Sequence, residues 1–277
     1  MKLTALSIFV ALLFATTSAD AENPKFATLD RVGTSSNFSA DLGLTFFDND
    51  FSDATGINLR LHTDYFFNRG TGLYGTLPIS YLMLDEVDDE SDVGNLEVGA
   101  MFLPRMGSQT SLILRAGLAL PTATDGGATF LNAFGQLSDY VLHFPDVMSL
   151  RFSASLLSRN RGSFFWRLDG GLDVPFDTAD DGEPQTDIDP LLRFNVGAGV
   201  RTGGAALMIE LANLGTTGDV VDSEDRFIHS LGFSARFTSS AVQPMVALVV
   251  PVDDELRELV NFTLFVGISA PLNAGAR

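Results

Sequence analysis

The sequence contains no cysteine and only two lysines, Lys2 and Lys25. Without cysteine the chain has no disulfide, no thiolate metal site, no cysteine nucleophile and no lipoprotein anchor at its N-terminus. Basic residues are scarce in general, since 17 Lys and Arg stand against 35 Asp and Glu, which gives a formal net charge of −18. A nucleic-acid-binding protein needs a basic surface, so we expect no nucleic-acid partner.

Catalytic signatures are also missing. The sequence has no Gly-x-Ser-x-Gly elbow, no His-Glu-x-x-His pair and no glycine-rich phosphate loop. It has three histidines: His62, His143 and His229. His62 shares a strand face with Asp64, but a histidine there is more typical of a hydrogen-bonded wall, and the neighbours His229 and Ser230 point to opposite faces. We therefore predict a protein that is not an enzyme, with no cofactor and no metal.

Long hydrophobic runs are absent after the N-terminus. Residues 1–21 combine Lys2, an apolar run from Leu3 to Ala15 and the small-x-small sequence Ala19-Asp20-Ala21, a pattern typical of a cleaved secretory signal peptide. The run is shorter than the ~20 residues that a transmembrane helix needs. A mature chain of this kind can span a membrane only as a closed β-barrel. Residues 22–36 are predicted to form a polar periplasmic arm, and residues 37–272 the barrel.

Alternation of apolar and polar residues is what the sequence has in abundance. In residues 57–65 the odd positions are Ile, Leu, Leu, Thr and Tyr, whereas the even positions are Asn, Arg, His and Asp. A β-strand sends successive side chains to opposite faces, and no helix sorts residues in this way. One such strand does not distinguish a soluble sheet from a membrane barrel, because ordinary antiparallel strands also alternate.

Similar alternation recurs along most of the chain. The predicted strands are residues 37–47, 57–65, 72–84, 94–103, 110–120, 147–157, 163–174, 191–202, 204–213, 227–238, 242–251 and 259–270. Every second link is short, whereas the others are longer and acidic, for example residues 85–92 and 177–189. Short periplasmic turns and long external loops are typical of outer-membrane barrels. We predict an all-β fold: a single antiparallel transmembrane β-barrel of about 12 strands, within a range of about 10 to 14.

One segment departs from the strand pattern. Phe130, Phe134, Leu137, Val141 and Phe144 recur at spacings of three and four, which predicts a short amphipathic helix over residues 130–142. The helix falls within an external loop, the long link after the strand at 110–120. Two roles stay open for it: a lid or gate at the mouth, or a helix that packs on the barrel rim.

The polar strand faces predict the residues that line the lumen. The set contains seven arginines, six carboxylates and one histidine, so it is nearly neutral and the large negative charge lies mainly in the loops. The candidate lumen-lining residues are Asp41, Arg60, His62, Asp64, Glu97, Arg115, Arg151, Arg167, Asp169, Asp173, Arg193, Arg201, Glu210 and Arg236. Such a set fits either a narrow selective pore or a closed, ion-paired interior that only supports the wall.

Three short stretches resemble a known family. Gly94-Asn95-Leu96-Glu97-Val98-Gly99, Arg115-Ala116-Gly117-Leu118-Ala119-Leu120-Pro121-Thr122 and Asp169-Gly170-Gly171-Leu172-Asp173-Val174-Pro175 are similar to segments of outer-membrane barrels grouped with the meta-pathway phenol-degradation transporters. The resemblance implies an outer-membrane barrel that passes small hydrophobic or aromatic compounds. It carries over no binding residue.

These observations lead to one functional hypothesis and two alternatives. The first is a narrow channel or transporter in the cell outer membrane for small, hydrophobic or aromatic, compounds. The second is a structural barrel with a closed lumen, and the third is a hydrolase that acts on lipid or peptide at the rim. The expected partners are outer-membrane lipid, the outer-membrane assembly machinery and a small-molecule solute.

Overall fold

The computed structural model describes residues 25–27, 33–48, 54–84, 89–104, 106, 109–124, 126–158, 162–179, 189–218 and 226–272. The predicted signal peptide, residues 1–21, lies outside the described residues. So does most of the acidic stretch at 177–189.

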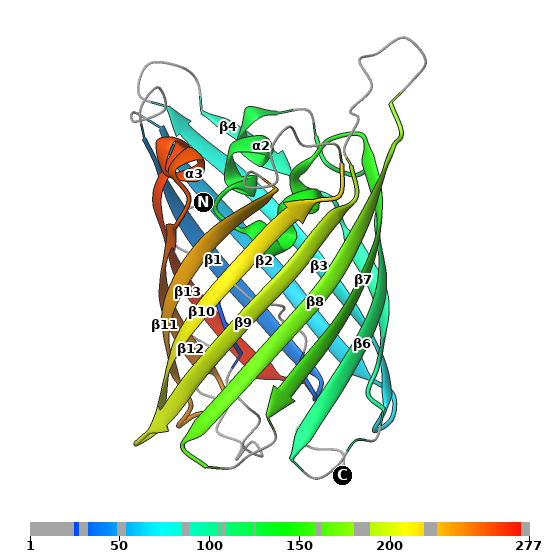
Figure 1. Ribbon diagram of the computed structural model, residues 1–277, viewed down its shortest axis with the longest axis vertical. Helices are drawn as coiled ribbons and strands as arrows, with labels where there is room; N and C mark the ends of the chain where they lie inside the picture. The colour runs from blue at the N-terminus through cyan, green and yellow to red at the C-terminus, as the bar shows by residue number, and fades with distance from the viewer. Residues whose placement is uncertain are drawn as a thin grey trace, which may run out of the picture.

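Twelve antiparallel strands form a closed barrel in chain order (Figure 1). The ring closes where β1 (Asn37–Phe47) pairs with β13 (Val260–Pro271). The other wall strands are β2 (Ala54–Phe66), β3 (Thr71–Leu84), β5 (Glu97–Phe102), β6 (Thr110–Ala119), β7 (Val147–Ser158), β8 (Phe164–Asp177), β9 (Leu191–Thr202), β10 (Ala205–Thr216), β11 (Phe227–Phe237) and β12 (Gln243–Pro251). The predicted barrel of about 12 strands is confirmed.

The outer surface of the barrel is apolar. Exposed side chains from successive strands include Leu73, Phe194 and Val266, and each is more than half exposed. Their sequence neighbours point inward because strand side chains alternate. A closed ring also satisfies every strand edge, which an open sheet in lipid would not.

Short turns join the strands at one end of the barrel. Between β9 and β10 the turn consists of Gly203 and Gly204, whose φ angles are 52° and 94°. Two consecutive positive φ angles are typical of a type I′ hairpin turn, and glycine adopts them without strain. The longer connections lie at the opposite end (Figure 1).

The strand predicted at 94–103 is wrong in its first half. The chain forms β4 (Glu90–Val93) and then β5, and both pair with β3. Gly94, Asn95 and Leu96 belong to neither strand. The break lies beside Pro78 of β3, which has no N–H to donate. Pro78 accepts one bond there, from the Gly94 N–H at 2.9 Å.

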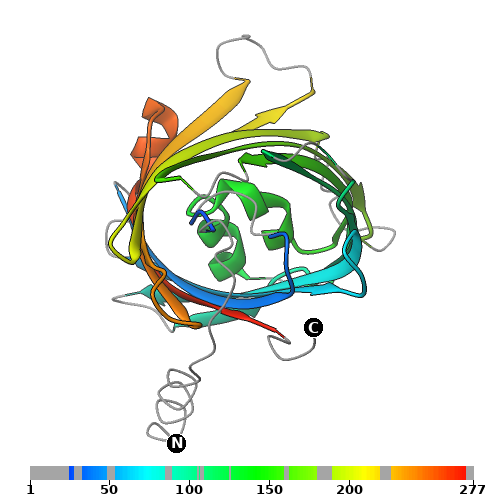
Figure 2. The ribbon, with the colours of Figure 1, turned by 90° about the horizontal axis from the view of Figure 1, so that it is seen from below.

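The short helix predicted in the link after the strand at 110–120 is confirmed, but it is not continuous over 130–142. The chain forms α2 (Gly127–Ala133) and a 3-10 helix, η3 (Leu137–His143), with a break between them. We call residues 126–146 the helical insert. Figure 2 shows it within the ring of strands, and Figure 1 shows α2 near the upper end of the barrel, so the helical insert fills the lumen near one end and does not pack on the outside of the rim. Leu137, Val141 and Leu142 of η3 are buried against wall residues, so the apolar stripe faces the wall of the lumen.

Two further features lie outside the sequence predictions. A short helix, α3 (Asp254–Leu259), precedes β13. Within the described ranges, no helix has the length and apolar character to cross a membrane. Residues Lys25–Ala27, which we call the N-terminal segment, are buried against the inner wall: Phe26 packs with Phe165 and Ala27 with Met245. This part of the predicted periplasmic arm therefore occupies the lumen.

Candidate functional site

The candidate lumen residues all lie on the inner face of the wall. Twelve of the fourteen are buried, and the side chains of Arg115 and Arg201 are half-buried. They are buried because the helical insert and the N-terminal segment fill the space between opposite walls. The filled lumen is thus the candidate functional site, and its polar contacts fall into three groups.

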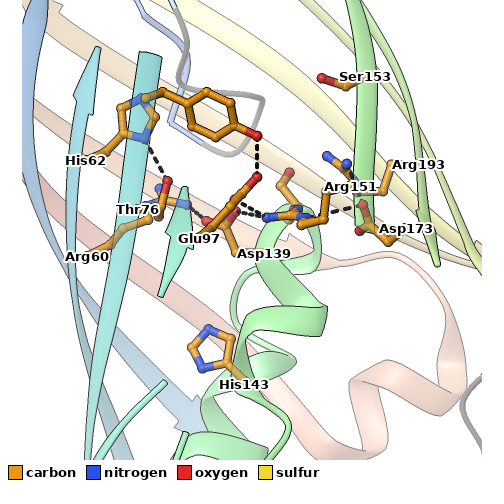
Figure 3. A network of polar contacts seen from close by, with 12 residues as sticks. Arg60, His62, Thr76, Glu97, Asp139, His143, Arg151, Ser153, Asp173 and Arg193 are labelled. Carbon is orange, nitrogen blue, oxygen red and sulfur yellow. Dashed lines mark hydrogen bonds and ion pairs between the residues drawn. The ribbon is translucent and has the colours of Figure 1, made fainter. Parts of the chain in front are cut away.

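The first group is a network of six charged side chains in the middle of the barrel (Figure 3). Asp139 of the helical insert binds Arg60 of β2 and lies 3.8 Å from Arg151 of β7. Arg151 also binds Glu97 of β5, at 2.5 Å, and Asp173 of β8, at 3.2 Å. Arg193 of β9 extends the network through a 2.7 Å contact with Asp173. We call these six residues the central network.

Tyr74 of β3 supports one end of this network. Its hydroxyl donates to Glu97 Oε1 at 2.6 Å, and the Arg115 guanidinium lies 4.8 Å from its ring centre. The ring fits because two glycines face it. A Cβ on Gly117 would lie 2.1 Å from the Tyr74 hydroxyl, and one on Gly99 would lie 2.5 Å from the ring.

Most charges of the wall are paired with other charges of the wall. Glu97 and Asp173 bind Arg151 without help from the helical insert. Arg167 and Asp169 of β8 form a separate pair at 2.7 Å, and Arg167 also donates to Ser155 at 3.0 Å. Of these pairs, Arg151 and Asp173 lie opposite each other on the neighbouring strands β7 and β8, and such a cross-strand ion pair holds its two strands in register.

The second group holds the N-terminal segment. The Lys25 ammonium lies 3.0 Å from Asp64 and donates to the Asn37 side chain at 3.1 Å. Arg236 donates to the Lys25 carbonyl oxygen at 3.0 Å, and the Ala27 N–H donates to Glu210 at 2.9 Å. Side chains from β1, β2, β10 and β11 thus bind the N-terminal segment through Lys25 and Ala27.

Arg60 contacts both fillings of the lumen. One of its terminal nitrogens binds Asp139, and the other lies 3.5 Å from the Ala27 carbonyl oxygen. Its Nε has no hydrogen-bond partner although the side chain is buried. In register, Arg60 lies opposite Asp41 of β1, which is also buried. The helical insert and the N-terminal segment therefore meet at a single wall arginine.

The third group anchors the two ends of the helical insert. At its start, Glu90 accepts a hydrogen bond from the Gly127 N–H at 3.0 Å, and Asp92 accepts one from Thr129 at 3.4 Å. These two acids belong to the predicted acidic loop at 85–92. Part of that loop therefore binds the first backbone N–H groups of α2, in addition to any contact with solvent. The N-cap residue of α2 is Gly126.

At the other end of the helical insert, Asn95 in the strand break makes the contacts. Its backbone N–H donates to the Leu142 oxygen at 2.7 Å, and its side chain donates to the Phe144 oxygen at 2.7 Å. Its side-chain oxygen accepts the N–H groups of Thr122 and Ala123, both at 2.9 Å. The break beside Pro78 thereby fastens the insert to the wall.

The histidines differ in environment. His62 lies 2.8 Å from Thr76 Oγ1 and 2.9 Å from Asp64 Oδ1, within the wall as its strand position predicted. His143 of η3 is fully buried with Nε2 3.4 Å from the Asn58 amide, and burial lowers its pKa to about 4. His229 pairs with Asp253 at 2.9 Å near the start of α3. Among the described residues no three His, Asp or Glu side chains are grouped to hold a metal ion.

Sequence reasoning missed three residues that organise the site. Lys25 is the one lysine outside the predicted signal peptide, and its isolation in an acidic chain was a signal. Asp139 is the one acid between Gly127 and His143. The helix there is predicted from its apolar residues alone, and that pattern gives its single carboxylate no role. Tyr74 follows from strand parity, because Leu73 and Leu77 point outward.

No family model and no curated protein matches the sequence. Solved structures do match. An outer membrane channel from Pseudomonas putida F1 is 15% identical with a TM-score of 0.63, over 92% of this chain and all of that chain. The KdgM porin in complex with disordered oligogalacturonate is 11% identical with a TM-score of 0.52, over 84% and 99% of the two chains. The NanC porin is 8% identical with a TM-score of 0.51, over 84% and 100%. The chain therefore has the fold of the outer-membrane channels and porins that it matches.

Proposed function

We propose that this protein is a gated outer-membrane channel for small solutes, closed here by its own helical insert and N-terminal segment. The observation that carries the proposal is the pairing of the wall. Arg151 binds both Glu97 and Asp173, and Arg167 binds Asp169. Because these pairs do not need the fillings, the wall retains them when a filling moves.

The width of the barrel supports the same conclusion. Side chains alone fill the interior of barrels of about eight strands, whereas barrels of about sixteen enclose an aqueous channel. Twelve strands lie between these limits, and here two chain segments occupy the space that side chains leave. The similarity in fold to a channel and to two porins agrees with this reading.

Hydrophobic or aromatic compounds are the solutes we propose. The resemblance to barrels of phenol-degradation pathways suggests them, and the helical insert presents four aromatic rings. Phe130, Phe134, Tyr140 and Phe144 form a closed cluster, in which each ring contacts two others with ring centres 4.9 to 5.9 Å apart. Phe130 is 45% exposed, so it offers an aromatic surface to an incoming ring.

Planar-bilayer conductance and solute uptake into liposomes test the channel. The purified full-length protein should give small current steps and admit phenol faster than empty liposomes do. A variant without residues 127–143 should give larger steps, because the helical insert fills much of the lumen. No current from either protein would support the structural barrel with a closed lumen instead.

We propose no catalytic role. A hydrogen-bonded chain of Thr76, His62 and Asp64 has the order of a nucleophile, a base and an orienting acid. However, all three side chains are buried, and Asp64 is already bound to Lys25. Lipase or peptidase activity that disappears in His62→Ala and persists in His229→Ala would establish the hydrolase alternative.

A further inference from the structure

Asp139 occupies a position between two arginines of the wall (Figure 3). It lies in the first turn of η3 and is mostly buried, with Arg60 of β2 in contact and Arg151 of β7 at 3.8 Å. β2 and β7 are separated by three wall strands, so the carboxylate joins distant parts of the lumen. A guanidinium is the side chain best shaped to hold a carboxylate.

The charges of the central network balance only when Asp139 is present. Arg60, Arg151 and Arg193 supply three positive charges, and Glu97, Asp173 and Asp139 supply three negative ones. Without Asp139, three guanidinium groups face two carboxylates. A buried charge left without a partner is strongly unfavourable. Movement of the helical insert therefore leaves the six-residue central network with one positive charge in excess.

Unused hydrogen-bond donors in the wall point in the same direction. Nε of Arg60 and Nε of Arg193 are buried and have no acceptor, even with the helical insert in place. Two arginines of the central network thus each keep one donor that no acceptor of the chain uses. A solute with a carboxylate supplies both the missing charge and additional acceptors.

We propose that Arg60 and Arg151 form a binding site for the carboxylate of a solute in transit, and that Asp139 is the tethered carboxylate that occupies this site in the closed channel. The inference rests on the proposed function and specifies its solute: a small molecule with one carboxylate, since one negative charge replaces that of Asp139. An aromatic acid such as benzoate meets this description and also the aromatic surface of the helical insert.

Removal of the tethered carboxylate tests the site. Asp139→Asn keeps the shape of the side chain and removes its charge. In detergent-solubilised full-length protein, benzoate should bind about tenfold more tightly to Asp139→Asn than to the wild type, because the competitor is gone. Benzyl alcohol, which has the ring without the charge, should bind both equally. Asp139→Ser serves as a second variant, and heat-modifiable gel mobility shows that each is folded.

Arg60 provides the matched control. Arg60→Lys in the Asp139→Asn background should lose most of the benzoate affinity, since an ammonium cannot hold a carboxylate with two parallel hydrogen bonds. Arg167→Lys in the same background should retain it, because Arg167 pairs with Asp169 apart from this network. Equal benzoate affinity in the wild type, Asp139→Asn and Asp139→Ser would overturn the site.

Conductance separates this inference from the proposed function. If the channel and the site both exist, Asp139→Asn should conduct with a greater preference for anions, and benzoate should block its current whereas benzyl alcohol should not. Benzoate binding without current in any variant would refute the channel and retain the site. Current with no response to benzoate would retain the channel and refute the site.

Discussion

Lys25 of the N-terminal segment and Asp64 of β2 form an ion pair at 3.0 Å, and both side chains are buried, at 6% and 0% exposed. The pair joins the chain that precedes the barrel to the second strand of its wall. Asp64 also accepts from His62 at 2.9 Å, so the pair continues into the hydrogen bonds of β2 and β3. This ion pair holds the N-terminal segment against the wall.

Replacing Lys25 with methionine should release the N-terminal segment. Loss of one partner leaves the Asp64 carboxylate buried without the Lys25 charge, which destabilises the docked segment by about 3–5 kcal/mol. Phe26 should then become open to chymotrypsin in the folded barrel. Lys25→Arg, which keeps the charge, should protect Phe26. Equal cleavage in Lys25→Met and Lys25→Arg would show that the ion pair does not hold the segment.

A methyl group on Gly126 should loosen the start of the helical insert. The added Cβ would lie 1.9 Å from Asp92 Oδ2, and Asp92 caps α2 through Thr129. Because the chain has no cysteine, a single Ala133→Cys reports on release: this buried position should react faster with maleimide in Gly126→Ala. Gly127→Ala is the control, since its Cβ would meet Glu90 at 3.1 Å, where a flexible side chain can yield.

Acidification should also release the helical insert. Burial lowers the pKa of His143 from 6.5 to about 4, while Asp139 favours its protonation and Arg151 opposes it. Between these two values the released form binds a proton that the docked form does not. Docking is therefore most stable above pH 6.5, and the docked-to-released ratio should fall by about tenfold per pH unit as the pH drops through this window.

Maleimide labelling of the same Ala133→Cys variant between pH 7 and pH 5 would measure this dependence, after correction for the reactivity of a free thiol. His143→Gln removes the titrating ring and should flatten the profile. A profile of the same slope in His143→Gln would assign the effect to another group. The acidic residues are the obvious alternative, since they also gain protons at low pH.

Tyr74 and Gly117 should show strongly coupled effects on stability. Tyr74→Phe removes the 2.6 Å hydrogen bond to Glu97, at a cost of about 1 to 3 kcal/mol. Gly117→Ala should cost more, since its Cβ would lie 2.1 Å from the Tyr74 hydroxyl. The double variant should be more stable than the sum of the two effects predicts, because phenylalanine has no hydroxyl to clash. Midpoints of heat-modifiable gel mobility would show whether the two effects simply add.

Much of the wall could be predicted from the sequence because its rule is local. Alternation needs only the nearest neighbours of each residue, and it gave the limits of β1 and β9 as the structure has them. The break between β4 and β5 depends on Pro78, which lies on a neighbouring strand. A proline interrupts a neighbouring strand only because the two strands pair. The alternation pattern of one strand carries no information about its pairing partners.

The contents of the lumen could not be predicted in the same way. The stripe from Phe130 to Phe144 indicated an apolar partner, but the rim and the inner wall offer similar apolar surfaces. Burial of η3 against Ala119, Val147 and Leu214 decides between them, and these residues come from the neighbouring strands β6 and β7 and from the more distant β10. Lys25 and Asp64 are 39 positions apart in the sequence, so no local sequence pattern predicts their ion pair.

The bonds between Asn95 and the helical insert limit how this barrel can open. Leu142 and Phe144 are fastened to the strand break by Asn95, which is itself fully buried. The helical insert therefore cannot withdraw as a free plug. It can swing, with Leu142–Phe144 as the hinge and α2 as the moving end. Such a swing carries Asp139 away from Arg60 and the His143 ring away from Asn58 of β2, while the backbone of Leu142 and Phe144 stays bound to Asn95. The passage then opens on one side only, along β2 and β3.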